Sequence, residues 1–124
     1  MNFEQAKAAW LAARRRFFTF PNQKGGYARN AEGQQVSARD PHAVCWCSIG
    51  ALFKEEPDLD GPSFPFRKVS ELLVKDMTEY GSGKFGPDPK LGFFSFANFS
   101  DNSPMGEVKL FWDDYGRARN FLPA

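Results

Sequence analysis

Aromatic residues constrain the core of this chain more than any other feature of its sequence. The 124 residues include 14 Phe, 3 Trp and 3 Tyr, and each such ring removes ~150–250 Å² from water when it is buried. A chain of this length forms one modest core. Rings must therefore make up most of that core, and some of them should stay exposed. The sequence predicts a single compact domain over residues 1–124.

The spacing of apolar residues predicts a mainly helical chain. At the start, Asn2 and Gln5 match a capping box, and apolar residues then recur every three or four positions up to Phe17. Similar spacing and helix-start residues predict helices over about residues 3–17, 41–55, 69–80 and 104–119. The four Phe of residues 91–99 should be mostly core, although periodicity does not decide between strand and helix there.

Residues 24–52 predict the centre of the fold. A hairpin is expected from Tyr27 to Val36, because Gly33 can adopt the left-handed conformation of a short loop. Asp40 before Pro41 is typical of a helix start, and the following run is apolar on nearly all sides. The predicted fold class is α+β and mainly helical, with about four helices arranged around this buried central helix and one small β-hairpin.

The charge balance gives the chain no overall electrostatic field for a phosphate backbone or a membrane. The net charge is +1 and the pI is near 7.8. No basic segment followed by an apolar run opens the sequence, and no apolar stretch approaches the ~20 residues needed to span a bilayer. We expect a cytoplasmic protein without a membrane partner.

One segment gathers the metal-ligating residue types. His42, Cys45 and Cys47 lie close together, but structural zinc usually takes four ligands and the chain has no other Cys or His. On the expected helix the two Cys side chains would point ~200° apart, which opposes both a disulfide and chelation of one ion. The sequence therefore predicts free thiols, no metal and no cofactor.

Catalysis remains an alternative hypothesis. Cys47 or Cys45 could act as a nucleophile with His42 as its base, or Asp101 and Glu107 could supply paired carboxylates. However, a thiol buried among apolar side chains has a raised pKa and is unreactive. The balance of these arguments is against an enzyme.

Phe residues on loops rich in Pro and Gly favour a protein-binding function. Such loops lose little conformational entropy when they bind, so their rings could serve as anchors for a host protein. The predicted interface consists of Phe64, Phe66, Phe85, Phe93, Phe94 and Phe96. Nucleic-acid binding is the alternative, and its predicted basic patch consists of Arg14, Arg15, Arg16, Lys24, Arg29 and Arg39.

Most of the chain resembles an uncharacterised family of small bacterial and bacteriophage proteins, a domain of unknown function. The shared residues are a hairpin at 26–33, an Arg-Asp-Pro at 39–41, an aromatic-Cys-x-x-Gly-Ala-Leu segment at 46–52 and a late Asp101 before Glu107-Val108. Ser100 replaces the family's usual Asn, and His42 and Cys45 have no counterpart.

The resemblance implies a compact helical domain with a small β element in a phage or mobile-element setting, and it implies no particular activity. In that setting, a small non-enzymatic protein could act by occluding a host protein. An inhibitor of host defence, such as an anti-CRISPR protein, is one example of the expected function.

Overall fold

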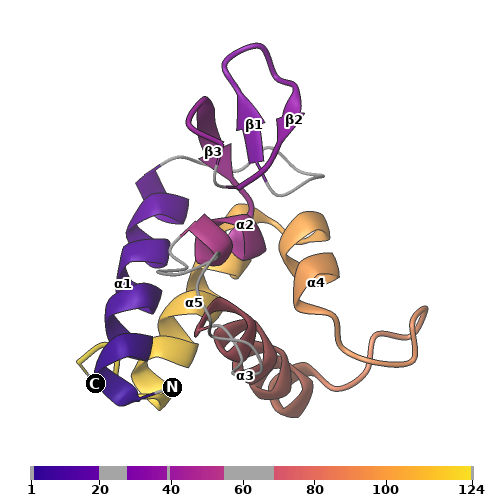
Figure 1. Ribbon diagram of the computed structural model, residues 1–124. Coiled ribbons are helices and arrows are strands. Elements are labelled where there is room, and N and C mark those ends of the chain that lie inside the picture. Colours follow the sequence, from indigo (N-terminus) through magenta and orange to yellow (C-terminus); the bar gives the residue numbers. More distant parts are fainter. Residues whose placement is uncertain (1, 20–27, 39, 55–68, 124) are drawn as a thin grey trace.

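The computed structural model describes residues 2–19, 28–38, 40–54 and 69–123. These residues form a mainly helical α+β fold, as predicted, in which a small sheet caps one end of a group of helices (Figure 1). The elements are α1 (Phe3–Thr19), β1 (Ala28–Asn30), β2 (Gln35–Val36), β3 (Ala43–Trp46), α2 (Ser48–Lys54), α3 (Val69–Phe85), α4 (Phe96–Asn102) and α5 (Met105–Ala118).

Helix α1 starts where the sequence predicts. The Gln5 backbone N–H donates to Asn2 Oδ1 at 2.7 Å, which satisfies one of the free donors at the helix start. Ala6, Trp10, Ala13 and Phe17 are buried along one face, the spacing expected of an amphipathic helix. The helix ends two residues beyond the predicted end, at Thr19.

Aromatic rings join α1 to α5, which is also confirmed as a helix. Trp10 and Trp112 have ring centroids 5.6 Å apart, and Phe17 stacks on Trp112 at 5.7 Å with an angle of 17° between the rings. Trp10, Phe17 and Trp112 are each fully buried. The rings thus build the centre of the core, as the composition predicts.

The predicted hairpin forms, and it belongs to a three-stranded antiparallel sheet of order β2-β1-β3. Gly33 has φ +80° at the hairpin loop, a conformation that Gly adopts without steric cost. The side chain of Asn30 closes the loop, because its Oδ1 accepts from the backbone N–H groups of Glu32 and Gln34 at 3.1 and 2.9 Å.

The predicted helix over residues 41–55 is wrong in its first half. Asp40 does not cap a helix: its Oδ1 accepts from the His42 N–H at 2.7 Å in a local turn. Residues 43–46 then pair with β1 as strand β3, with Cys45 opposite Arg29. Helix α2 starts only at Ser48, so pairing with β1 overrides the helical pattern of the sequence.

Helix α2 is nevertheless the central helix of the fold. It contacts α1, α3 and α4, and its residues Ser48 to Leu52 are buried. Ser48 Oγ also joins three elements, since it lies 2.8 Å from Ser100 Oγ and accepts from Trp112 Nε1 at 2.9 Å. A buried polar group needs such partners to offset the loss of its hydration.

Helix α3 continues past Tyr80, where the sequence predicts its end, to Phe85. Gly81 is buried in this added turn, and a Cβ atom there would overlap the ring of Phe94. Gly81 therefore serves close packing rather than a turn. None of the described helices combines the length and the apolar character needed to cross a membrane.

A half-exposed ion pair links α3 to the end of α5. Asp76 Oδ2 accepts from Tyr115 Oη and from Arg119 Nε, each at 2.7 Å. Burial by itself would raise the pKa of Asp76, but the hydrogen bonds from Arg119 and Tyr115 outweigh it and hold this pKa below its ordinary value.

This cluster predicts a loss of stability in acid. Because the pKa of Asp76 is lower in the folded protein, its contribution is present above about pH 4 and is lost as the pH falls through the folded-state pKa. Exposure limits that contribution to about 1 kcal/mol. Urea denaturation from pH 7 to pH 2 measures how the free energy of unfolding falls in acid. Asp76→Asn should make this fall smaller. Glu79→Gln, on an exposed residue of the same helix, should leave it unchanged. Equal acid limbs for Asp76→Asn and the wild type would contradict this account.

Candidate protein-binding site

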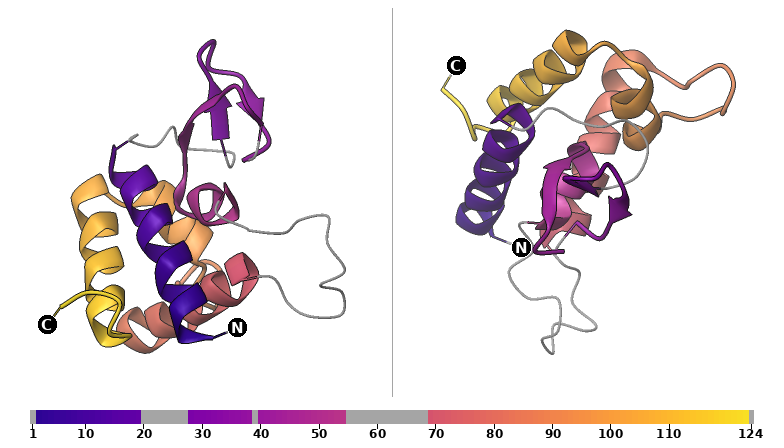
Figure 2. Two further views of the ribbon diagram at one scale, coloured as in Figure 1. Left: turned by 60° about the vertical axis from the view of Figure 1, so that its left-hand side comes forward. Right: turned by 90° about the horizontal axis from the view of Figure 1, so that it is seen from above.

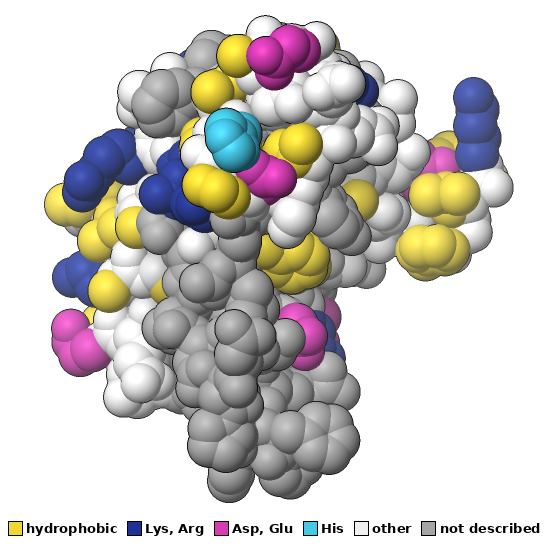
Figure 3. Space-filling model, turned by 45° about the horizontal axis from the view of Figure 1, so that its top comes forward, with side chains coloured by type: hydrophobic (Ala, Val, Ile, Leu, Met, Phe, Trp, Pro, Cys, Tyr) yellow, Lys and Arg dark blue, Asp and Glu magenta, His cyan; other side chains and the backbone are white. Residues whose placement is uncertain are grey.

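Residues 86–95, between α3 and α4, form a lobe that stands away from the helices. Two views show the lobe clear of the helical body (Figures 1 and 2). In the space-filling view it stands out at the right, with hydrophobic side chains gathered on it (Figure 3). Most of its residues from Pro87 to Phe93 are exposed to solvent.

Hydrogen bonds around Asp88 fix the shape of the lobe. Its carboxylate Oδ1 accepts from the N–H groups of Lys90 and Leu91 at 2.8 and 3.2 Å. Its backbone carbonyl accepts from Gly92 at 2.8 Å, and its N–H donates to the Phe93 carbonyl at 3.2 Å. Gly92 has φ +80°. The lobe is thus a turn that four internal hydrogen bonds close.

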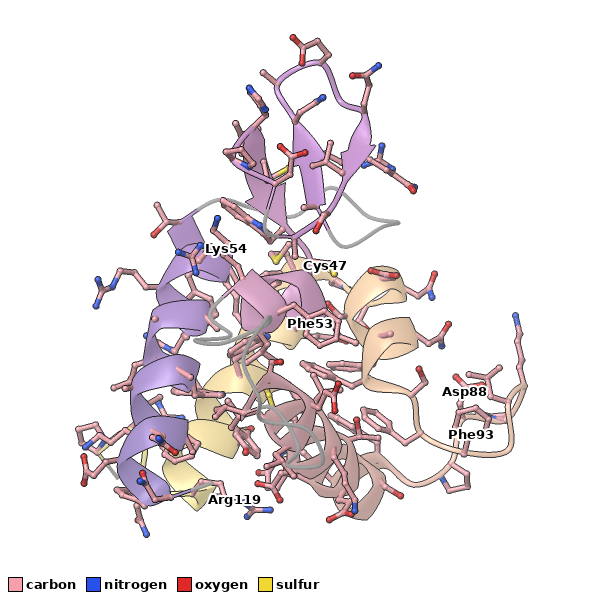
Figure 4. The ribbon with its side chains drawn as sticks, in the orientation of Figure 1. Cys47, Phe53, Lys54, Asp88, Phe93 and Arg119 are labelled. Carbon is pink, nitrogen blue, oxygen red and sulfur yellow. The ribbon has the colours of Figure 1, made fainter. Side chains whose placement is uncertain are left out.

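This turn presents large apolar side chains to solvent. Phe93 is 59% exposed and Leu91 is 43% exposed, and Figure 4 shows Asp88 and Phe93 together on the lobe. Phe85, just before the lobe, is 49% exposed although it stacks on Phe99 at 5.2 Å. Single exposed apolar residues are ordinary, but here three of them lie within nine residues, two on the lobe and one at the end of α3 beside it.

A groove of about 450 Å³ lies between the lobe, α4 and the start of α5. Phe85, Phe94 and Phe99 supply its apolar part. Its polar lining includes Ser95, Asn98, Asn102, Asp88 and Glu107. The volume falls within the ~300–1,000 Å³ range of small-molecule sites.

The structure places the rings of the predicted interface in different surroundings. Phe85 and Phe93 are exposed as that interface requires. Phe94 and Phe96 are only 8% and 1% exposed, because they pack with Phe111 in the core, and they cannot serve as free anchors. Phe64 and Phe66 lie outside the described residues.

Several arginines of the predicted basic patch contact other groups within the protein. Arg14 pairs with Asp113 at 2.8 Å, and Arg29 donates to the Gly33 carbonyl of its own hairpin at 2.7 Å. Arg16 lies over the ring of Trp46, while Arg15 is exposed. Lys24 and Arg39 lie outside the described residues.

Cys47 occupies a structural position where the sheet joins α2 (Figure 4). It is 5% exposed, and its Sγ accepts from the Gly50 N–H at 3.3 Å, which caps α2. Burial raises the pKa of this thiol, so little of it is the reactive thiolate. His42 lies at the surface, with Nδ1 3.3 Å from Asp40 Oδ1. Within the described ranges, no three Cys, His, Asp or Glu residues come together in a way that could hold a metal ion.

Sequence reasoning missed several residues of the lobe and the groove, among them Asp88, Leu91 and Asn102. The pattern Pro-Asp-Pro followed by Gly92 does indicate a turn. Which side of that turn faces solvent depends on how Phe94 packs on α3, and no local pattern shows that.

No family model matches this chain, and no curated protein or solved structure shows significant similarity to it. The function must therefore be argued from the lobe and the groove themselves.

Proposed function

We propose that this protein is a non-enzymatic binding module that attaches to another protein through the lobe and the groove beside it. The observation that carries the proposal is the exposure of Phe93 and Leu91 on a turn that Asp88 holds closed. Aromatic side chains such as Phe are enriched in protein interfaces relative to the rest of the surface.

The rigidity of the lobe favours binding over a purely structural role. A loop that is already ordered loses little conformational entropy when a partner covers it. Burying Leu91 and Phe93 would then contribute most of their hydrophobic free energy to the complex, since each large apolar side chain gives about 1.5–3 kcal/mol when fully buried.

The setting implied by the sequence resemblance suggests how such a module would act. A phage or mobile-element protein of this size could occlude a functional surface of a host protein simply by occupying it. Inhibition of a host-defence protein is one example of such occlusion.

Substitution of the lobe residues tests the proposal. Leu91→Ser combined with Phe93→Ser should fold normally, because both side chains are exposed, but should reduce partner binding about 30-fold or more if both are anchors. The measurement is quantitative affinity capture from bacterial lysate, followed by titration of the captured protein. A photo-crosslinking residue at position 93 should label the same protein.

A matched variant removes a similar exposed apolar area elsewhere. Val44→Ser combined with Leu110→Ser changes side chains that are 47% and 57% exposed on β3 and α5. This control should keep full binding. The proposal fails if no stoichiometric partner is captured, or if the lobe variant and the control variant bind the partner equally well.

A further inference from the structure

We propose that the groove beside the lobe binds an arginine side chain of the partner protein; this inference rests on the function proposed above. The described residues that line the groove supply aromatic rings, two carboxylates and amide oxygens, and none of them is Lys or Arg. A planar guanidinium stacks on rings and donates several hydrogen bonds to carboxylate and amide oxygens.

The protein already holds two of its own arginines in this way. Arg14 lies with its Cζ 4.4 Å from the centroid of Phe18, and its Nε is 2.8 Å from Asp113 Oδ1. At the C-terminal end of α5, Arg119 lies with its Cζ 5.4 Å from the centroid of Tyr115, and its Nε is 2.7 Å from Asp76 Oδ2. Two places in this fold thus hold an arginine side chain between an aromatic ring and a carboxylate.

The groove repeats this combination without an arginine. Phe85 and Phe99 are stacked with centroids 5.2 Å apart and an angle of 27° between the rings, and both line the groove together with Glu107. Glu107 is exposed and makes no ion pair within the described part of the chain. Lys84 makes a long cation–π contact with Phe85, with its Nζ 5.9 Å from the ring centroid. That Nζ pairs with Asp114 at 3.1 Å, and Lys84 is not among the described residues that line the groove.

The remaining polar groups also favour a donor-rich ligand. Asn102 uses its Nδ2 for Asn98, donating to the backbone carbonyl at 3.0 Å and to Oδ1 at 2.8 Å. That leaves the amide oxygen of Asn102 as an acceptor. Guanidinium is a donor-only group with five N–H bonds, so it matches carboxylate and amide oxygens better than an anionic ligand or a single ammonium does.

Titration of the intact protein with a small probe tests the inference. The probe is Nα-acetyl-arginine methylamide, followed by two-dimensional NMR of the backbone amides. We expect shifts at Phe99, Asn102 and Glu107, with a dissociation constant of about 1–10 mM. The citrulline analogue has the same shape without the charge, and it should bind at least about fivefold more weakly.

Two variants assign the effect to the groove carboxylate. Glu107→Gln should weaken binding of the arginine probe about fivefold or more, whereas Glu79→Gln, outside the groove, should leave it unchanged. Equal shifts with the arginine and citrulline probes, or full arginine binding by Glu107→Gln, would overturn the proposal.

The two proposals fail in distinguishable ways. If the probe does not bind while the Leu91→Ser and Phe93→Ser variant still loses its protein partner, the arginine site is rejected and the binding function stands. If the probe binds while that variant keeps its partner, the groove accepts arginine but the lobe is not the anchor.

Discussion

Gly116→Ala should destabilise the protein by about 3 kcal/mol, the upper part of the range for overpacked cores. A Cβ atom at position 116 would overlap the ring of Trp10 and lie 3.0 Å from Leu122 Cδ1. Trp10 cannot move aside, because Trp112, Tyr115 and Phe121 surround it with ring centroids 5.5–6.0 Å away. The loss is a large fraction of the 5–15 kcal/mol typical of a domain. Urea denaturation measures this loss of unfolding free energy directly. In thermal denaturation, the midpoint should fall by roughly 10 °C.

Gly106→Ala is the matched control for Gly116→Ala. It lies on the same helix, and a Cβ atom there meets nothing within 4 Å. Replacing an exposed helical Gly by Ala stabilises a helix by up to about 1 kcal/mol, so the two variants should change stability in opposite directions. If Gly116→Ala were as stable as the wild type, the ring of Trp10 would not be held by its neighbours as described.

Local chemistry explains why helices α1 and α5 could be predicted from the sequence. Their apolar residues recur at helical spacing, and Asn2 caps α1 as the sequence predicts. The start of α5 was predicted only approximately, because its N-cap is Pro104, without a side-chain hydrogen bond, and Ser103 ends α4 instead. The Gly33 hairpin was predictable for the same reason, since its loop depends on one left-handed residue. In these segments local preference and the tertiary fold agree.

Pairing between strands β1 and β3 explains why the helix predicted from residue 41 was wrong in its first half. Residues 43–46 have a pattern that suits a buried helix, but β1 offers their backbone a strand partner, and Asp40 makes a turn instead of a cap. Cys47 then caps α2 with its sulfur, a role for which the usual residues are Ser, Thr, Asp and Asn. Neither fact is contained in the local sequence.

The candidate site was only half predictable for a similar reason. Composition indicates that some rings stay exposed but not which ones. Phe93 and Phe94 are neighbours in the sequence, yet Phe93 is 59% exposed and Phe94 only 8%. The contact between Phe94 and Gly81, thirteen positions earlier in the sequence, decides which ring turns inward. The groove depends on the same contact, since Phe94 is part of its lining.

Gly81→Ala should therefore disturb the lobe more than the rest of the fold. The added Cβ overlaps the ring of Phe94. This ring lies at the edge of the core, where the added atom can push it outward together with the lobe, whereas Trp10 is fully buried. We expect a stability loss of about 1–2 kcal/mol, together with faster hydrogen exchange of the Gly92 amide, which bonds to Asp88 in the intact lobe. Partner binding should weaken at least about tenfold, because the lobe would lose its preorganised shape.

Gly83→Ala separates this effect from a general response of α3 to alanine. Gly83 is exposed two residues further along the helix, and a Cβ atom there meets nothing within 4 Å. This variant should keep the slow exchange of Gly92 and the binding of the partner, with a helix stabilised by up to about 1 kcal/mol. If Gly81→Ala also kept both properties, the hydrogen bonds of Asp88 alone would hold the lobe, and the packing of Phe94 on α3 would not position the site.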